Sequence, residues 1–459
     1  MMMNKGTRYF IWLLMFPLMF SSSCRNTWLE AKPDKSLVVP NTIKDYQALL
    51  DNTSTTFNIF QASGLAEMAA GDFYITNTSW LNLFSIQEKS AYIWEQTSKF
   101  YNGEASTDWV ESYKRILNAN VILEGIEKIK PAANEQQEWN NVKGSALFLR
   151  AFDFFHLAQE YCKSYVASTA ITEMGLPLRL EYNVNIQVKR STLQQTYDQI
   201  IKDLDLAVDL LGSHPTYKTR PSKQAVYALL ARVYLAMENY DQAGIKADAA
   251  LKIQSELLDF SKLNNNASYP VERFNTEVIF HSTFSYGIFN ATRLIVEPGL
   301  FELYAADDYR KQLFFKSVAA GVTYRGNYSG DKNFFGGLAT DELYLIRAES
   351  KARNGDLPSA LADLNHLLKS RWKGVYTDMV SNDPDLVLRL ILTERRKELI
   401  FRGIRWSDLR RLNRDSRFAV TLTRVLNGQT YTLLPNDKRY VFPIDEEELR
   451  LSGIQQNER

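Results

Sequence analysis

Cysteine is almost absent from this sequence, and that absence excludes a fold held together by disulfides. The chain of 459 residues contains two cysteines, Cys24 and Cys162. If Cys24 is acylated, as its sequence context predicts, Cys162 has no partner for an intramolecular disulfide. Cys162 follows an apolar helical segment, and we expect it to be a buried thiol. The fold must therefore be stabilised by packing.

An excess of charge of either sign is also missing. The 54 Lys and Arg residues are balanced by 53 Asp and Glu residues, and the formal net charge is +1. The sequence contains no long basic run. Because binding to nucleic acid requires a concentrated basic surface that neutralises phosphates, we expect no nucleic-acid partner.

Standard catalytic and metal-binding motifs are absent as well. The sequence has no HExxH, no Gly-x-Ser-x-Gly, no Walker-type loop and no CxxC. Only one of its four histidines has a helical carboxylate neighbour, and we interpret that pair, His156 and Glu160, as a helix-surface interaction. We expect no catalytic residue, no cofactor and no metal site. A glycoside hydrolase remains the enzymatic alternative, because its two carboxylates have no fixed spacing in sequence.

The N-terminus carries a targeting signal. Lys5 and Arg8 precede an apolar run at residues 9–20, which is too short to span a bilayer but is typical of a secretory signal. Ser21–Ser23 then precede Cys24. Small residues before a cysteine resemble a bacterial lipobox, where the thiol is acylated and the chain is cut before it.

We therefore predict a lipoprotein signal peptide at residues 1–23 and lipid attachment at Cys24. Residues 24–40 have two prolines and no helical period, which indicates a tether. Acylation would attach the protein to a membrane through a lipid anchor. A plain signal peptide with an incidental cysteine is the alternative.

Regular helices dominate the chain after residue 108. Apolar residues recur at helical spacing in segments that we predict to be helices at residues 109–129, 138–163, 193–211, 222–237 and 240–253. The first two should form an antiparallel hairpin, and Ser222 should cap the fourth. Alternation near the C-terminus predicts a small β-hairpin at residues 431–444.

A short internal repeat indicates helical hairpins of the tetratricopeptide type. Ala231 and Ala243 are twelve residues apart, as are Ala348 and Ala360, and a turn precedes the second alanine of each pair. Small residues at this spacing allow two antiparallel helices to approach closely. We predict such hairpins at residues 222–253 and 341–371.

Two aromatic-rich segments, residues 72–103 and 260–340, lack this periodicity. We expect long loops over the scaffold in the first, and a loop-rich ligand-binding insert in the second. Trp94 and Trp109 should pack in the core. Our candidates for ligand contact are Trp80 in the first segment and Tyr286, Phe289, Tyr324 and Tyr328 in the insert.

The stretch Ile391–Leu412 combines charge with aromatic and aliphatic residues more densely than any other segment. Glu394, Glu398 and Arg402 are spaced four residues apart and would share one face of a helix. Gly403 stands where a left-handed residue would end that helix. Two interpretations are open: a catalytic carboxylate cluster, or a structural ion-pair network at a helix corner.

We favour the structural interpretation, because ion-pair networks perturb carboxylates as readily as active sites do. Such a network would be partly buried and would fix two helices around the glycine. Its predicted members are Arg395, Glu398, Arg405 and Asp408, packed against Trp406.

Several short motifs, in this order, resemble those of the SusD/RagB family. They are Cys24 with residues 28–33 (WLEAKP), residues 109–120 (WVESYKRILNAN), 148–155 (FLRAFDFF), 175–177 (GLP), 190–211, 220–243, 342–350 (ELYLIRAES), 393–412 and 440–449 (YVFPIDEEEL). The resemblance covers nearly the whole chain after Cys24. At residue 402 the chain has Arg where the family commonly has Glu.

The resemblance implies a mostly α fold: a tetratricopeptide-like helical hairpin scaffold with long aromatic-rich loops and a small β element. It implies one fold over residues 41–459. Its parts would be an N-terminal helical half at 41–259, the insert at 260–340 and a C-terminal half at 341–459.

The resemblance also implies a function. Family members are surface lipoproteins that bind nutrients, usually glycans, beside a SusC-like TonB-dependent transporter in the outer membrane. We therefore expect capture of a glycan or oligosaccharide without cleavage, on a lipid-anchored protein facing the cell surface. The alternatives are the same architecture binding peptide or another nutrient, and a lipid-anchored glycoside hydrolase.

Overall fold

The computed structural model of the protein describes residues 40–97 and 99–459. The chain divides into residues 1–41 and residues 42–459, and the helices and strands of the described residues belong to the second unit. The predicted signal peptide, Cys24 and almost all of the predicted tether lie outside the described residues. Those three assignments therefore remain predictions.

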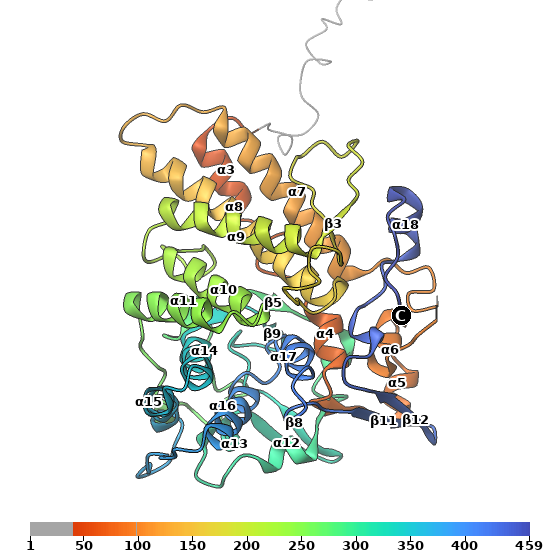
Figure 1. Cartoon of the computed structure of the whole chain (residues 1–459), viewed down its shortest axis with the longest axis vertical. Helices are drawn as coiled ribbons and strands as arrows, with labels where there is room; N and C mark the ends of the chain where they lie inside the picture. The colour runs from red at the N-terminus through yellow and green to blue at the C-terminus, as the bar shows by residue number, and fades with distance from the viewer. Residues whose placement is uncertain (1–39, 98) are drawn as a thin grey trace, which may run out of the picture. The chain divides into compact units, whose positions relative to one another are not determined.

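The scaffold is a series of helices in which each packs on the next. It consists of α7 (Thr107–Glu127), α8 (Gln136–Tyr161), α9 (Leu193–Leu210), α10 (Lys223–Ala236), α11 (Tyr240–Ile253), α14 (Thr340–Arg353) and α15 (Leu357–Lys369). Successive members contact each other, including α11 and α14, which are separated in sequence by the insert (Figure 1). The predicted antiparallel pair of residues 109–129 and 138–163 is confirmed as α7 and α8.

The two predicted tetratricopeptide-like hairpins are also confirmed. They are α10 with α11 and α14 with α15. All four alanines of the repeat are fully buried, so the helices approach closely where the small residues face each other. The Ser222 side chain caps α10 as predicted, by accepting a hydrogen bond from the Ala225 N–H.

Helix α8 is the central helix because it is apolar around most of its circumference. Phe148, Phe154 and Leu157 point in different directions and all are fully buried. A helix that is apolar on all sides must be covered on all sides, and α8 contacts α3 (Ile43–Leu50), α7 and α9. The prediction that Cys162, just after α8, is a buried thiol is confirmed.

The interpretation of His156 and Glu160 as a surface pair is wrong. Both side chains are buried, because the face of α8 that carries them packs inside the protein. The His156 Nδ1 atom lies 2.7 Å from the Phe152 carbonyl oxygen. Trp94 and Trp109, by contrast, lie in the core as predicted.

Further helices surround the scaffold. They are α4 (Gly64–Ala69), α5 (Asn77–Leu81), α6 (Ile86–Ile93), α12 (Pro298–Glu302), α13 (Tyr309–Leu313), α16 (Pro384–Glu398), α17 (Arg405–Leu412) and α18 (Glu446–Ser452), with single 3₁₀ turns η2 (Phe260–Lys262), η3 (Gly287–Phe289) and η4 (Lys438–Tyr440). Residues 72–103 are therefore less irregular than predicted, since they include α5 and α6. Within the described residues, no helix is both long and apolar enough to span a membrane.

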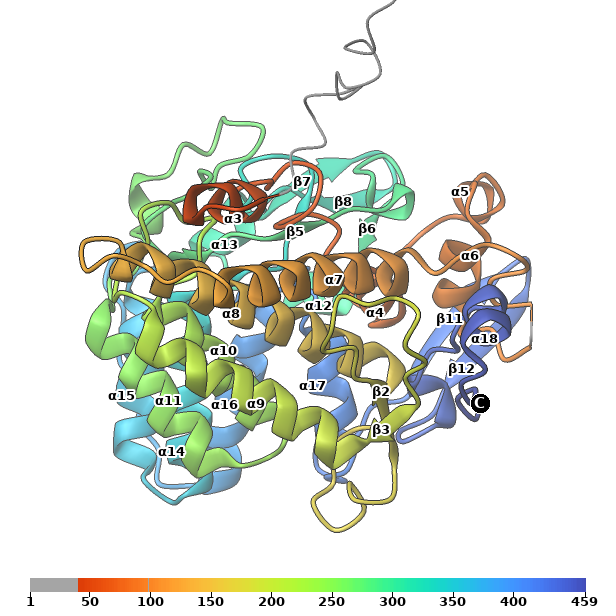
Figure 2. The same cartoon turned by 90° about the horizontal axis from the view of Figure 1, so that it is seen from above.

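The strands form small antiparallel pairs. These are β1 (Phe73–Tyr74) with β6 (Ile295–Val296), β2 (Met174–Pro177) with β3 (Arg190–Thr192), β4 (Val278–Phe280) with β10 (Leu338–Ala339), β5 (Thr283–Phe284) with β9 (Phe334–Phe335), β7 (Phe315–Val318) with β8 (Gly321–Tyr324), and β11 (Leu422–Leu426) with β12 (Gln429–Leu433). In Figure 2 the insert strands β6, β7 and β8 lie above α7, and α9 and α11 lie below it. The predicted mostly α fold with small β elements is confirmed.

The β-hairpin predicted at residues 431–444 is wrong in position. The observed hairpin is β11 with β12, and Leu426 pairs with Gln429 across its turn. Asn427 and Gly428 form that turn with φ angles of 51° and 76°. An Asn-Gly pair with two positive φ angles is the preferred two-residue hairpin turn, so this signal is present in the sequence.

Candidate functional site

A cavity of about 560 Å³ lies among the loops of the insert. One side is formed by the segment after β5, which includes η3, and the other by the segment between β8 and β9. Its lining residues are Phe60, Tyr269, Ser285, Tyr286, Gly287, Phe289, Asn290, Ala291, Arg293, Tyr324, Asn327, Lys332, Asn333 and Phe334. We call it the insert cavity.

Three aromatic rings form the floor of the insert cavity. The ring centroids of Phe289 and Phe334 are 4.7 Å apart, and those of Tyr324 and Phe334 are 5.9 Å apart in an edge-to-face arrangement. Below them, the Phe401 ring stacks on Phe334 at 5.2 Å. Phe401 belongs to the turn between α16 and α17, so the helix corner supports the floor of the cavity.

Tyr286 forms a wall of the cavity and is held from two sides. Its hydroxyl donates a hydrogen bond of 2.6 Å to Asp108 Oδ1. Its ring lies directly on Gly64, where a Cβ atom would be 2.0 Å from the Tyr286 Cε2 atom. Only glycine therefore leaves room for the ring in this position.

Behind Tyr286, Asp108 and Glu160 bind the start of α4. Asp108 Oδ2 accepts a hydrogen bond from the Leu65 N–H at 3.0 Å, and Glu160 Oε1 accepts one from the Ala66 N–H at 3.1 Å. Burial raises the pKa of both carboxyls, and each lies in hydrogen-bond contact with the other. The two carboxyls therefore hold the start of α4 beneath the cavity wall.

A third acid, Glu67, links α4 to the helix corner. Its Oε2 atom accepts a hydrogen bond of 2.8 Å from the Gly403 N–H. Burial, reinforced by the charge of Asp72, raises the pKa of Glu67 to about 8. Glu67 is therefore largely protonated at neutral pH.

Phe60 is an exposed aromatic residue at the edge of the insert cavity. Its side chain is 45% exposed, and its φ angle is 51°, which is unusual for a bulky residue. Arg115 Nη1 holds the loop by donating to the Phe60 and Ile59 carbonyls at 2.9 and 3.0 Å. Strained backbone that positions an exposed ring is typical of functional sites. Phe60 is not among the residues predicted from the sequence, since its neighbours give no periodic or motif signal.

Polar groups complete the rim. Arg293 donates to the Gly287 carbonyl at 2.8 Å, which fixes the loop around η3, while Asn290 and Lys332 are exposed. None of the described residues that line this cavity is Asp or Glu. The cavity thus combines aromatic rings with amide, guanidinium and ammonium donors.

The structure brings three of the five predicted ligand-contact residues together. Tyr286, Phe289 and Tyr324 all line the insert cavity. Tyr328 does not, because it is fully buried and donates to Glu277 Oε2 at 2.5 Å. Trp80 is half-buried on α5, outside this cavity, and its indole N–H donates to the Lys89 carbonyl at 3.3 Å.

The residues of the predicted network at the helix corner have different partners and do not form one network. Arg395 Nε donates to Asp408 Oδ2 at 2.8 Å, which joins α16 to α17 as expected. The Arg405 Nε atom lies 3.8 Å from Asp72 Oδ1 and has no hydrogen-bond partner. Trp406 stacks on Phe442 with ring centroids 5.5 Å apart.

Glu398 forms ion pairs with residues far away in sequence. It accepts hydrogen bonds from Arg371 Nε at 2.8 Å and from Arg310 Nη1 at 2.7 Å. Arg310 comes from the insert and Arg371 follows α15. The inference that Glu398 joins Arg395 is therefore wrong, because the local sequence of the corner could not reveal these distant partners.

Arg402 also lies apart from the helical face on which we expected it. Helix α16 ends at Glu398, so the spacing of four residues no longer places Arg402 beside it. Arg402 Nη2 instead pairs with Asp341 Oδ2 at 2.6 Å, and its guanidinium lies 3.8 Å from the centroid of the Tyr328 ring. Gly403 does have a left-handed conformation, with φ of 70°.

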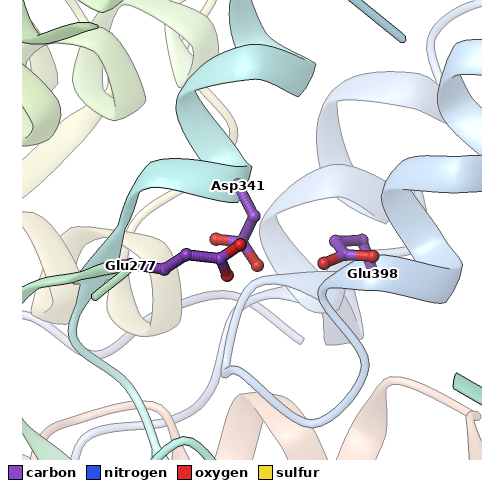
Figure 3. Close-up of side chains that lie close together, drawn as sticks. All are labelled: Glu277, Asp341 and Glu398. Atoms are coloured by element: carbon purple, nitrogen blue, oxygen red, sulfur yellow. The ribbon is translucent and has the colours of Figure 1, made fainter. Parts of the chain in front are cut away.

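Three buried carboxylates meet at this corner: Glu277, Asp341 and Glu398 (Figure 3). One oxygen atom from each lies within 4.8 Å of the others, which is close enough to consider a metal ion. Each carboxylate, however, is already paired with a guanidinium, as Arg371 Nη2 pairs with Glu277 Oε1 at 2.7 Å. We therefore interpret the cluster as an ion-pair network that joins the insert to α14 and α16.

The network shifts the pKa values of its acids in opposite directions. Although burial raises the pKa of Glu398, Arg371 and Arg310 lower it more, to about 2. The pKa of Asp341 is raised, because burial and the neighbouring carboxylates outweigh Arg402. Glu398 is thus a permanent charge held between two arginines.

Comparisons with known proteins agree with this architecture. A family described as "Starch-binding associating with outer membrane" matches residues 27–235, and one described as "SusD family" matches residues 340–458. SusD-like protein P38 of Formosa agariphila is 25% identical over 413 residues, which cover 71% of this chain and 76% of that protein.

Solved structures show the same fold. A putative sugar binding protein from Bacteroides vulgatus has a TM-score of 0.74 at 20% identity, covering 92% of this chain and 99% of that one. A laminarin binding SusD-like protein has a TM-score of 0.64 at 17% identity, covering 90% and 97%. The two family matches span the α7 to α10 scaffold and the helix corner, and in both regions the chain is similar to proteins of the SusD/RagB family.

Proposed function

We propose that this protein captures a glycan or oligosaccharide in the insert cavity. The observation that carries the proposal is the lining: Phe60, Tyr286 and the aromatic floor provide apolar surfaces, and Asn290 and Lys332 provide donors at the rim. Aromatic faces pack on the apolar faces of sugar rings, and a few convergent polar groups satisfy the hydroxyls. The volume of about 560 Å³ suits a short segment of a glycan chain.

The lining also supports binding without cleavage. Glycoside hydrolysis requires a pair of carboxyl groups that flank the scissile bond. The described lining of the insert cavity contains no carboxyl group. Two carboxyls that contact the cavity walls from behind are already hydrogen-bonded: Asp108 accepts from the Tyr286 hydroxyl and the Leu65 N–H, and Glu88 accepts from the Ile288 N–H.

The proposed setting is the outer membrane. Similarity to the SusD/RagB family supports this location, and the lipobox-like sequence before Cys24 supports attachment by acylation. The protein would then present its ligand to a SusC-like TonB-dependent transporter. Replacing Cys24 by Ala should release the protein from the membrane fraction and abolish its labelling with palmitate. Unchanged labelling would contradict the lipid anchor.

Calorimetry against a panel of polysaccharides and peptides tests the ligand class. We expect at least one glycan to bind without release of reducing ends, and Tyr286→Ala to weaken that binding. Trp80→Ala is the second arm, because the sequence predicts ligand contact by Trp80 and the structure places it outside the cavity. Loss of binding only in Trp80→Ala would place the glycan site at α5. Binding of peptides but of no glycan would contradict the glycan proposal and support a peptide ligand.

A further inference from the structure

Two basic side chains line the insert cavity from different segments of the insert. Arg293 follows η3 on one side of the cavity, and Lys332 lies between β8 and β9 on the other. The other described lining residues are aromatic, amide-bearing, hydroxyl-bearing or small, and none of them is acidic. The charges that line this cavity are therefore all positive.

Lys332 has no partner in the fold. Its side chain is exposed, and its ammonium group makes no hydrogen bond or ion pair with the described residues. The adjacent acid, Asp331, does not line the cavity, and its Oδ1 atom accepts a hydrogen bond of 2.8 Å from the Asn333 N–H. The Lys332 ammonium group is therefore available to a ligand.

Arg293 is half-buried and uses only part of its guanidinium group. Its Nη1 atom donates to the Gly287 carbonyl, which fixes the loop around η3. Its Nε and Nη2 atoms make no hydrogen bond with any residue that the structure describes, and both are accessible to solvent. Arg293 thus keeps two donors for a ligand.

One acid, Glu88, lies behind the η3 loop. It is buried, and its Oε1 atom accepts a hydrogen bond of 2.8 Å from the Ile288 N–H. Burial raises the pKa of Glu88, against the opposing effects of the Ile288 N–H and of the Arg293 charge. Because Arg293 does not offset the burial of Glu88, the two do not form a closed ion pair.

A neutral glycan would leave both cations without a counter-ion. Its hydroxyl groups can be bound by Ser285 and Asn290, which are exposed at the cavity. A cation that loses water on ligand binding without gaining a negative partner reduces the affinity. A carboxylate or a sulfate ester supplies this partner and accepts charge-assisted hydrogen bonds, two of them where it meets a guanidinium group.

We propose that the ligand of the insert cavity is an acidic glycan that carries uronate carboxylates or sulfate esters. Arg293 and Lys332 bind its acidic groups, and the aromatic floor packs on its sugar rings. This inference rests on the proposed capture of a glycan and adds the class of glycan.

Titration calorimetry with matched pairs of polysaccharides tests the class. Polygalacturonate is compared with its methyl ester, and dextran sulfate with dextran. Any other glycan of the panel that binds is compared with its carboxyl-reduced or desulfated form. We expect each bound glycan to be acidic, and its neutral form to bind at least about tenfold more weakly. Loss of binding on removal of carboxylates identifies a uronate, and loss on removal of sulfate identifies a sulfate ester.

The contrary outcomes separate this inference from the proposed function. A glycan that binds as tightly in its neutral form as in its acidic form would overturn the acidic class and leave glycan capture intact. If no glycan binds in either form, glycan capture itself is contradicted, and the acidic class with it.

Variants of Lys332 assign the binding to this cavity. Lys332→Gln should weaken binding of the acidic glycan about tenfold and reduce its dependence on salt, without loss of thermal stability, because Lys332 has no partner to lose. Lys332→Arg keeps the charge and should bind like the wild type. Lys316→Gln is the matched control, since Lys316 is an exposed lysine of β7 that does not line the cavity. Equal affinities of Lys332→Gln and Lys316→Gln for the acidic glycan would contradict the assignment.

Discussion

The insert cavity and the buried ion-pair network are neighbours, and they use polar groups in opposite ways. Phe401 stacks beneath the cavity floor, and the next residue, Arg402, belongs to the network. In the network, Glu398 and its arginine partners are fully buried and paired. In the cavity, Asn290 and Lys332 are exposed beside aromatic rings. Charge density alone therefore does not locate a binding site; exposure and free hydrogen-bonding capacity do.

The largest expected effect comes from the network. Glu398→Gln leaves Arg310 and Arg371 without their shared counter-ion, and should reduce the free energy of unfolding by about 3–5 kcal/mol. Chemical denaturation measures the change. The matched control is Glu447→Gln, which removes an exposed ion pair with Arg450 and should change stability little. Normal stability of Glu398→Gln would show that the network does not hold the corner.

The second prediction concerns pH and the link between α4 and the corner. Glu67 has a raised pKa of about 8 in the folded protein, so its stabilising contribution is complete at low pH and is lost as the pH rises. Glu67→Gln mimics the protonated form. Between pH 5 and pH 8 the variant should gain stability relative to the wild type by on the order of 1 kcal/mol for each pH unit.

Thermal unfolding of the wild type and the variant at matched pH values measures this difference in stability. Subtracting the two stabilities removes the contribution of other titrating groups, such as the buried histidines, because it is the same in both proteins. A difference that does not depend on pH would mean that Glu67 is ionised throughout.

A smaller effect is expected at the cavity wall. Gly64→Ala places a Cβ atom against the Tyr286 ring, and should reduce the free energy of unfolding by about 1–3 kcal/mol. Because the ring must move, glycan binding should weaken as well. Gly212→Ala is the control, since its nearest contact would be 3.9 Å away. Full binding by Gly64→Ala would show that the position of Tyr286 does not shape the site.

Local patterns are sufficient to predict the scaffold. The Ser222 cap and the twelve-residue alanine spacing can be recognised in the sequence, because capping and helix pairing depend on residues that are close in sequence. The Asn427-Gly428 turn of the hairpin can also be recognised in the sequence. The alternation of apolar residues over 431–444 instead led to a predicted hairpin later in the chain. The mostly α fold thus follows from the sequence almost completely.

The sites are less predictable, because their geometry depends on contacts between distant segments. Tyr286 and Tyr328 look alike in the sequence, yet one lines the cavity and the other lies beneath Arg402. Glu398 has partners 27 and 88 residues away, which no local spacing indicates. Phe60 depends on Arg115 to hold its loop, and that contact also spans the fold.

The most direct test of the central claim compares two exposed phenylalanines. Phe60 is 45% exposed at the insert cavity, whereas Phe84 is 96% exposed and does not line it. Calorimetry with the best glycan of the panel should show affinity reduced about tenfold or more in Phe60→Ala, as expected for a lost aromatic contact with the ligand. Phe84→Ala should bind like the wild type. Equal affinities for Phe60→Ala and the wild type would contradict the assignment of the insert cavity as the glycan site.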